Sequence, residues 1–225
     1  MRISPDELVY FQWGPLNINA TIVFTWLVMA LLTFFGWVVA RKLSAGPEIP
    51  RGQNLLEVLV TGVLDQIGEA SQQDPRHFLP FVGTLFIFIA TSNVLSVVPG
   101  FQAPTGSLST TVALALCVFV AVPIYGIGRQ GVKNYLRQYL QPSPIMLPFN
   151  LIGEVSRTLA LAMRLFGNVM SGGMIVAVLL SIVPLFFPLV MQVFGLLTGL
   201  IQAYIFAILA MVYIASAMRI HDESH

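Results

Sequence analysis

The chain has 225 residues, of which 56% are hydrophobic and only 9% are charged, and its formal net charge at pH 7 is +1. Soluble domains carry about 25% charged residues, so this composition excludes an ordinary soluble protein and predicts one integral membrane domain over residues 1–225. The near-neutral charge argues against nucleic-acid binding. The single cysteine, Cys117, lies in an apolar run, and we expect it to be a small core residue. The N-terminus lacks the pattern of a cleaved signal peptide.

The first three predicted membrane helices cover residues 17–40, 78–98 and 107–128, each apolar over about the 20 residues that a span needs. Between the first two, residues 53–71 place apolar side chains at helical spacing, which predicts an amphipathic helix at the membrane interface. The polar segment 129–141 carries two tyrosines and is typical of an interfacial connection.

The last two apolar stretches, residues 147–183 and 189–218, predict a long hairpin. At 1.5 Å per residue the first would measure about 55 Å, against a hydrocarbon core of about 30 Å. It must therefore tilt strongly, bend or lie partly along the surface. The predicted fold class is all-α, with five membrane helices, one interfacial helix and a long tilted hairpin at the end. No internal repeat is visible, which argues against an inverted-repeat carrier.

The basic residues set the expected orientation in the membrane. Eight of them lie on one side of the predicted helices: Arg41, Lys42, Arg51, Arg76, Arg129, Lys133, Arg137 and Arg219. Arg2 lies on the other side. Because Lys and Arg collect in cytoplasmic loops, we expect the N-terminus outside and the C-terminus in the cytoplasm.

Arg164 is the residue that most needs an explanation. It lies in LALAMRLFGN, residues 159–168, an otherwise apolar segment. A guanidinium there costs roughly 2.5 to 3.5 kcal/mol on insertion scales and cannot lose its proton, so it needs a partner or a function. Helical spacing places a stripe of polar or small residues on one face of this helix, and small residues there leave room for another helix to approach. The stripe consists of Arg157, Ala160, Arg164, Asn168 and Ser171.

Structural interpretations stay open beside a functional one. Arg164 could be a structural cation bonded to helix-end carbonyls or to Glu154. Arg157 lies near the cytoplasmic end of its helix, where snorkelling or an i, i+3 pair with Glu154 is favoured over a mechanistic role.

The last helix carries a matching stripe of Gly195, Gly199 and Gln202, at spacing i, i+4 and i+7. The two glycines predict a close approach of another helix. Gln202 is the only amide between residues 194 and 216 and needs a hydrogen-bond partner, either within the hairpin or beside Arg164.

Two more polar residues lie in or near the predicted spans. Asn93 either bonds a neighbouring helix or lines a channel, and Gln192 either lines a wet path or lies at the level of the lipid headgroups. The sequence holds no phosphate loop, nucleophile elbow or metal-ligand spacing, so we expect no catalytic residue, no metal and no cofactor.

The segments RLFGN (164–168), SG (171–172) and QAYIF (202–206) resemble the a-subunit of rotary F-type ATP synthases. FLP (78–80), TSNVL (91–95) and VPG (98–100) look like the second membrane segment of that family. The likeness runs from about residue 78 to residue 217, and the two C-terminal segments together make it highly specific.

This resemblance implies a function. In the family, two offset aqueous half-channels lead ions to and from a carboxylate on each c-subunit of a rotating ring. The arginine matched by Arg164 separates the half-channels and keeps each passing carboxylate ionised. The implied ion-translocating residues are Arg164, Gln202, Asn168, Ser171 and Glu154, with Asn93 and Gln192 as candidate channel lining.

The resemblance also implies partners and a location. The partners would be the c-subunit ring, b-type peripheral stalk subunits, the soluble ATP-hydrolysing sector and membrane lipid. ATP chemistry would reside in the soluble sector, so this chain would be non-catalytic by itself. The expected location is the bacterial plasma (inner) membrane.

The sequence departs from the family pattern at the outer half-channel. Many proton-conducting members carry an acid or histidine nine residues after the arginine, paired with an ionisable group seven residues before the glutamine. Gly173 and Gly195 occupy these positions here. We therefore expect water and polar groups to line this half-channel.

Protons are the coupling ion expected from family frequency, and sodium, which needs no relay side chain, is the alternative. A small membrane permease subunit is the other alternative, with Arg164 binding an anionic substrate. A structural membrane scaffold would leave Arg164 unexplained.

Overall fold

The computed structural model describes residues 9–13, 16–41, 61–62, 78–98, 100–140, 145–182 and 187–218. Its elements are, in chain order, β1 (Val9–Trp13), β2 (Leu16–Asn19), α1 (Ala20–Arg41), α3 (Leu79–Leu95), η3 (Pro104–Gly106), α4 (Leu108–Gln130), α5 (Val132–Leu140), α6 (Met146–Ile182) and α7 (Phe187–Met218). Within this part of the chain, α1, α4, α6 and α7 are long and apolar enough to cross a membrane, and α3 is a shorter apolar helix of 17 residues. The predicted all-α membrane fold is confirmed for these helices.

Several helix boundaries differ from the predicted ones by one to three residues; α3, for example, ends at Leu95 instead of residue 98. Residues 17–19 belong to β2, which pairs with β1 in an antiparallel hairpin, so the first helix begins only at Ala20. The last helix begins at Phe187 instead of residue 189, with Pro188 in its first turn. A proline is tolerated there because the first N–H groups of a helix have no partner within it. The predicted interfacial helix 53–71 lies outside the described residues except for Thr61 and Gly62, which are helical.

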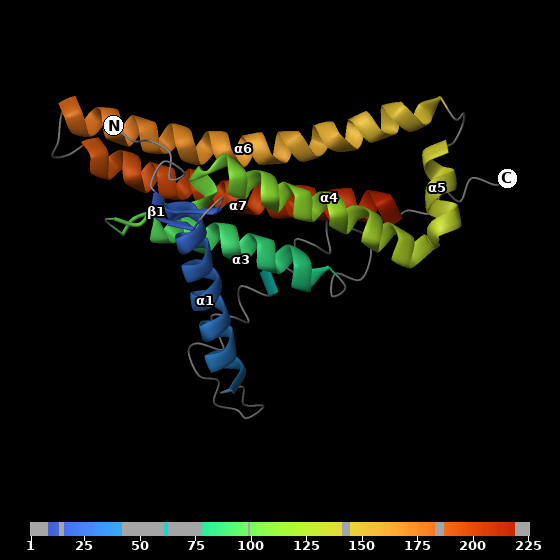
Figure 1. The fold of residues 1–225 in the computed structure, drawn as a ribbon, viewed down its shortest axis with the longest axis horizontal. Helices are drawn as coiled ribbons and strands as arrows, with labels where there is room; N and C mark the ends of the chain where they lie inside the picture. The colour runs from blue at the N-terminus through green and yellow to red at the C-terminus, as the bar shows by residue number, and fades with distance from the viewer. Residues whose placement is uncertain are drawn as a thin grey trace.

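The predicted hairpin of the last two helices is present. Figure 1 shows α6 and α7 side by side over most of their length, with α6 a single, gently bowed helix of 37 residues. α7 is the centre of the packing, because α3, α4 and α6 all lie against it. Its buried face includes Phe206, Ala210 and Ile214, none of which is exposed at all.

α1 runs crosswise to α6 and α7 (Figure 1). Its main contacts are with α3, β2 and η3, and Ala20 and Val28 are fully buried there. Toward its C-terminal end Phe34 and Trp37 are more than half exposed. Because the two directions cross steeply, α1 and α6 cannot both stand upright in one bilayer. This supports the expectation that the 37-residue helix is strongly tilted.

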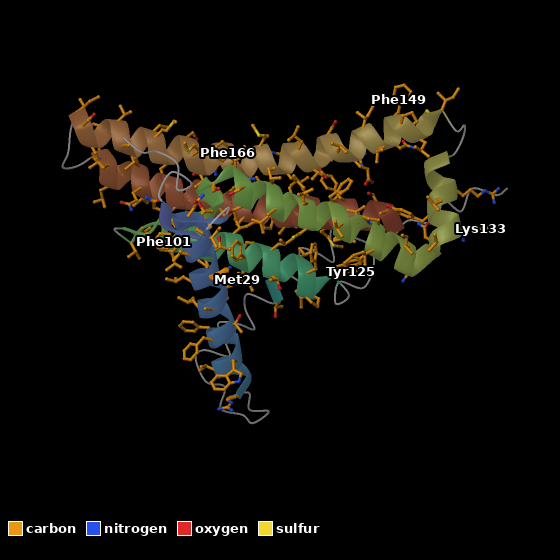
Figure 2. The ribbon with its side chains drawn as sticks, viewed as in Figure 1. Met29, Phe101, Tyr125, Lys133, Phe149 and Phe166 are labelled. Carbon is orange, nitrogen blue, oxygen red and sulfur yellow. The ribbon has the colours of Figure 1, made fainter. Side chains whose placement is uncertain are left out.

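Two short elements close the ends of the bundle. η3 contacts α1, α3, α4 and α6, and Thr105 within it is fully buried. At the opposite end α5 packs on α4, where a Cβ on Gly126 would lie 2.6 Å from Cε2 of Tyr135. Figure 2 shows these opposite ends, with Phe101 labelled near α1 and Lys133 labelled on α5.

Cys117 is exposed on α4. The expectation that it is a core residue is wrong. In a membrane helix an apolar position is as stable against lipid as against protein, so apolar surroundings in the sequence do not show which way the side chain points.

Candidate functional site

A cavity of about 550 Å³ lies between α3, α6, α7 and the segment that leads into η3. Three of the polar residues singled out in the sequence line it: Asn93, Asn168 and Gln192. Gly173 and Gly195, the two positions that depart from the family pattern, line it as well. The structure therefore brings residues that are up to 106 positions apart (93 to 199) into one cavity, whose lining is mostly apolar.

Asn93 of α3 forms the most complete polar contact in this cavity. Its side chain is 4% exposed, and Nδ2 donates a hydrogen bond of 2.8 Å to the carbonyl oxygen of Gly199 in α7. Its Oδ1 accepts a hydrogen bond of 3.4 Å from Oγ1 of Thr105. Asn93 thus bonds a neighbouring helix, as one of its two interpretations has it, and it also lines the cavity.

Asn168 and Gln192 are held in a similar way. Nδ2 of Asn168 donates to the carbonyl oxygen of Thr198 at 3.1 Å and so joins α6 to α7. Nε2 of Gln192 donates to the carbonyl oxygen of Val97 at 3.4 Å, which joins α7 to the turn after α3. The side-chain nitrogen of each amide therefore donates to a backbone carbonyl oxygen of a neighbouring segment.

The two glycines of α7 differ in their surroundings. A Cβ on Gly199 would lie 2.9 Å from Cγ of Asn93, so α3 approaches α7 there as closely as only glycine permits. At Gly195 nothing lies within 4 Å of the Cβ position. The predicted close approach is confirmed at Gly199 and is wrong at Gly195, where the missing side chain leaves space in the cavity instead.

Arg164 lies on the outer face of α6. Leu161, Ala162 and Leu165 turn toward the protein and are buried, whereas the side chain of Arg164 is exposed. Arg164 makes no hydrogen bond or ion pair with any residue that the structure describes. The geometry thus offers no support for a structural cation bonded to Glu154.

The predicted stripe on α6 divides between two faces. Arg157, Ala160 and Ser171 are exposed like Arg164, but Asn168 turns inward to α7 and is partly buried. The hydroxyl of Ser171 donates to the carbonyl oxygen of Asn168 at 3.2 Å and does not line the cavity. Figure 2 labels Phe166 in the middle of α6, close to the level of this stripe.

Gln202 of α7 is 5% exposed and lies apart from the cavity. Its Nε2 is buried and has no hydrogen-bond partner among the described residues. The interpretation in which the hairpin itself satisfies this amide nitrogen is therefore not supported. Leaving a buried donor without a partner costs about 1 to 3 kcal/mol.

Arg157 and Glu154 lie in the part of α6 that points toward α5. The guanidinium of Arg157 lies over the ring of Tyr213 at 5.8 Å from its centre, a cation–π contact with α7. Glu154 is partly buried, and its carbonyl oxygen accepts a hydrogen bond of 2.9 Å from the hydroxyl of Thr158. Ten residues separate Glu154 from Arg164, which is about 15 Å along a helix.

Among the residues that the structure describes, none that lines the cavity has an ionisable side chain. Ser96 and Gln102, which line it between α3 and η3, are polar residues of this site that sequence reasoning did not single out as candidates. A polar side chain in a loop needs no special explanation, whereas one in an apolar helix does. Among the described residues no group of three or more His, Cys, Asp or Glu side chains could hold a metal ion.

Comparison with known proteins extends the likeness over the whole chain. The family model described as ATP synthase A chain matches residues 22–215. ATP synthase subunit a 2 of Acaryochloris marina is 64% identical over 225 residues, which cover 100% of this chain and 96% of the relative. ATP synthase subunit a 1 of Crocosphaera subtropica is 60% identical, with 99% of this chain and 97% of the relative covered. ATP synthase subunit a of Albidiferax ferrireducens is 58% identical, with 97% and 95% covered.

Proposed function

Since this chain belongs to the ATP synthase a-subunit family and is thus a membrane subunit of an F-type ATP synthase that serves ATP synthesis and ion transport, we propose that it is the ion-translocating subunit of the complex. It would lead ions through two half-channels past the c-ring and carry out no ATP chemistry itself. The observation that carries this proposal is Arg164, an exposed guanidinium without a described partner in the middle of a 37-residue apolar helix.

Arg164 would meet the ring carboxylates. Its face of α6 is open, since Arg157, Ala160, Gly167 and Ser171 are all exposed along it. An opposite charge within about 4 to 6 Å favours the ionised form of a carboxylate, so each passing carboxyl group would release its ion beside the guanidinium. Gln202, which the resemblance puts beside the arginine, would act from inside the bundle, since its Nε2 is buried.

The cavity would be the outer half-channel. Asn93, Asn168 and Gln192 give it polar surface, and Asn168 is only one helical turn from Arg164. The space left by Gly173 and Gly195 would hold water in place of the ionisable pair found in many relatives. Glu154 lies toward the α5 end of α6 and would serve the cytoplasmic half-channel.

The placement of the half-channels implies an orientation and partners. The α5 end, which carries Arg129, Lys133 and Arg137, would face the cytoplasm of a bacterial cell, and the cavity end would face outward. The open face of α6 would adjoin the c-ring. The b-type stalk and the soluble ATP-hydrolysing sector would complete the complex.

Two ions are candidates for the coupling. The proton is the ion expected from the resemblance, and a chain of water molecules in the cavity would conduct it. Sodium is the second candidate, and one observation favours it: no ionisable side chain of the described part of the chain lines the cavity, so these residues offer no proton relay.

The test of the proposal is the substitution Arg164→Ala in the assembled complex, reconstituted in lipid vesicles. ATP-driven ion pumping should be lost, and Arg164→Lys should fail largely as well, because an ammonium is a point charge that can lose its proton. Arg157→Gln is the matched control on the same helix face. It removes only a cation–π contact worth roughly 0.5 to 1 kcal/mol, so coupled pumping should fall modestly. Robust coupled pumping by Arg164→Ala would disprove the assignment.

A further inference from the structure

α7 lies between α6 and α3 (Figure 1), and each of these two helices bonds its backbone with one side-chain amide. Nδ2 of Asn168 in α6 donates to the carbonyl oxygen of Thr198 at 3.1 Å. Nδ2 of Asn93 in α3 donates to the carbonyl oxygen of Gly199 at 2.8 Å. Because the two acceptors are successive residues, both amides hold the same turn of α7.

This turn carries Gln202. In an α-helix the N–H of each residue donates to the carbonyl oxygen four residues earlier, so the Thr198 carbonyl is the acceptor for the N–H of Gln202. A carbonyl oxygen has two lone pairs and can accept this bond and the amide bond together. Successive residues differ by about 100° around a helix axis, so the two amides reach the turn from two directions. They therefore restrain both rotation and sliding of α7 at the point where Gln202 is attached.

The amide of Asn93 is fixed at both of its ends. Its Nδ2 bonds α7, and its Oδ1 accepts a hydrogen bond of 3.4 Å from the hydroxyl of Thr105, a fully buried residue of η3. A Cβ on Gly199 would lie 2.9 Å from Cγ of Asn93, so the amide packs directly on the α7 backbone. A shift of this turn of α7 would therefore break a hydrogen bond or move α3.

The side-chain nitrogen of Gln202 has no comparable bond. Gln202 is almost fully buried, and among the described residues none accepts a hydrogen bond from its Nε2. This nitrogen is therefore not oriented by a hydrogen bond of its own to the described chain. Its place in the bundle depends on the backbone turn that carries it.

We infer that Asn93 and Asn168 are positioning residues, which fix the turn of α7 at Thr198 and Gly199 and thereby hold Gln202 in its place. The inference rests on the proposed function, in which Gln202 acts in ion translocation from inside the bundle. In this role neither amide contacts the ion. Loss of either amide would impair the step that Gln202 serves, although Gln202 itself is still present.

The first test measures how firmly Gln202 is held and does not depend on ion transport. In the assembled complex, with the exposed Cys117 removed by Cys117→Ala, the thiol introduced by Gln202→Cys is labelled with N-ethylmaleimide. Asn93→Leu keeps the branched shape and removes the amide. It should raise the labelling rate about threefold to tenfold, the effect of one lost hydrogen bond between membrane helices. Asn168→Leu should have the same effect and serves if Asn93→Leu does not assemble.

Two controls show whether the effect is local. Ser92 precedes Asn93 in α3 and is fully buried, but its hydroxyl bonds the carbonyl oxygen of Phe88 in its own helix, at 2.8 Å. Ser92→Ala should therefore leave the labelling rate unchanged. Met211→Cys places the thiol at a fully buried position farther along α7. That thiol should be labelled at the same rate with and without Asn93→Leu.

The second test is ATP synthesis by the assembled complex in lipid vesicles, with Gln202 present. Asn93→Leu and Asn168→Leu should each cause a partial loss of the maximal rate, which is reached where neither a lower outer pH nor more outer Na⁺ raises it further. Channel lining alone would retain the maximal rate and raise the outer ion concentration that gives half of it. Ser92→Ala should retain the rate of the parent.

Three results would overturn the inference. They are equal labelling of the Gln202→Cys thiol in the parent and both Leu variants, an equal rise at the Met211→Cys thiol, and a maximal rate that both Leu variants retain. Each of them leaves the proposed function in place as long as pumping still depends on Arg164. Pumping that survives Arg164→Ala would instead remove the proposed function.

Discussion

Gly173 occupies a position on α6 where a side chain would enter the cavity. It lines the cavity, and nothing lies within 4 Å of the place where its Cβ would be. A longer side chain would therefore first enter open space. This makes the position suitable for adding an ionisable group to a wall that has none.

We expect Gly173→Glu to add an ionisation step to the dependence of ion flux on external pH. The parent should show only the titration of the ring carboxylate and of groups outside the cavity, because no described residue of the cavity wall is ionisable. The new carboxylate should bind or gate the ion and so slow the flux. The measurement compares flux against external pH in vesicles at fixed membrane potential and sodium. A parent that already shows a separate outer-side ionisation would contradict this expectation.

At the level of single residues, the sequence was informative where polarity conflicted with its surroundings. Asn93, Asn168 and Gln192 attract attention because an amide in an apolar helix needs a partner, and all three line the cavity. Gln102 escaped notice because it lies outside any helix. Gly195 and Gly199 look alike in the sequence, and only the position of α3 decides that one is a contact and the other a void.

The crossing of α3 and α7 depends on Gly199. We expect Gly199→Ala to destabilise the subunit by about 1 to 3 kcal/mol, the usual cost of overpacking, because the new methyl group would press on the Asn93 side chain. Gly195→Ala, one turn away and open to the cavity, should be neutral or slightly stabilising, since alanine favours a helix by up to about 1 kcal/mol.

Both effects can be followed as the shift in the thermal midpoint of the assembled complex in detergent. An equal loss of stability in Gly195→Ala and Gly199→Ala would show that helix geometry, and not the contact with Asn93, controls this crossing.

At the level of elements, the membrane helices followed from length and apolarity, whereas the N-terminal hairpin did not. β1 and β2 span only 5 and 4 residues, and β2 runs directly into the apolar sequence of α1. Hydropathy averaged along the sequence therefore includes the strand in the predicted helix. The angle at which α1 crosses the other helices could not be predicted from the sequence either. Lipid and protein favour the same apolar side chains, so the sequence carries no signal for the crossing angle.

The molecule as a whole should have its α5 end in the cytoplasm. The two ends of α4 allow a direct check, because Ser109 and Lys133 are exposed at opposite ends of the α4–α5 segment. In a background that carries Cys117→Ala, we expect Lys133→Cys to react with a membrane-impermeant maleimide in inverted vesicles only. Ser109→Cys should react in right-side-out vesicles only. The reverse labelling pattern would show that the α5 end faces outward, and the assignments of the two proposed half-channels would then be exchanged.

The burial of η3 has a consequence for the making of the protein. A membrane chain is synthesised from its N-terminus, so α1, α3 and α4 are inserted before α6 and α7 exist. η3 is enclosed by α1, α3, α4 and α6, and Asn93 finds its acceptor only on α7. Until the C-terminal hairpin has been added, the cavity lacks two of its walls and has no fixed amides. A nascent or truncated chain would therefore not form this cavity, and if the cavity is the proposed half-channel, unfinished subunits would not dissipate the membrane potential.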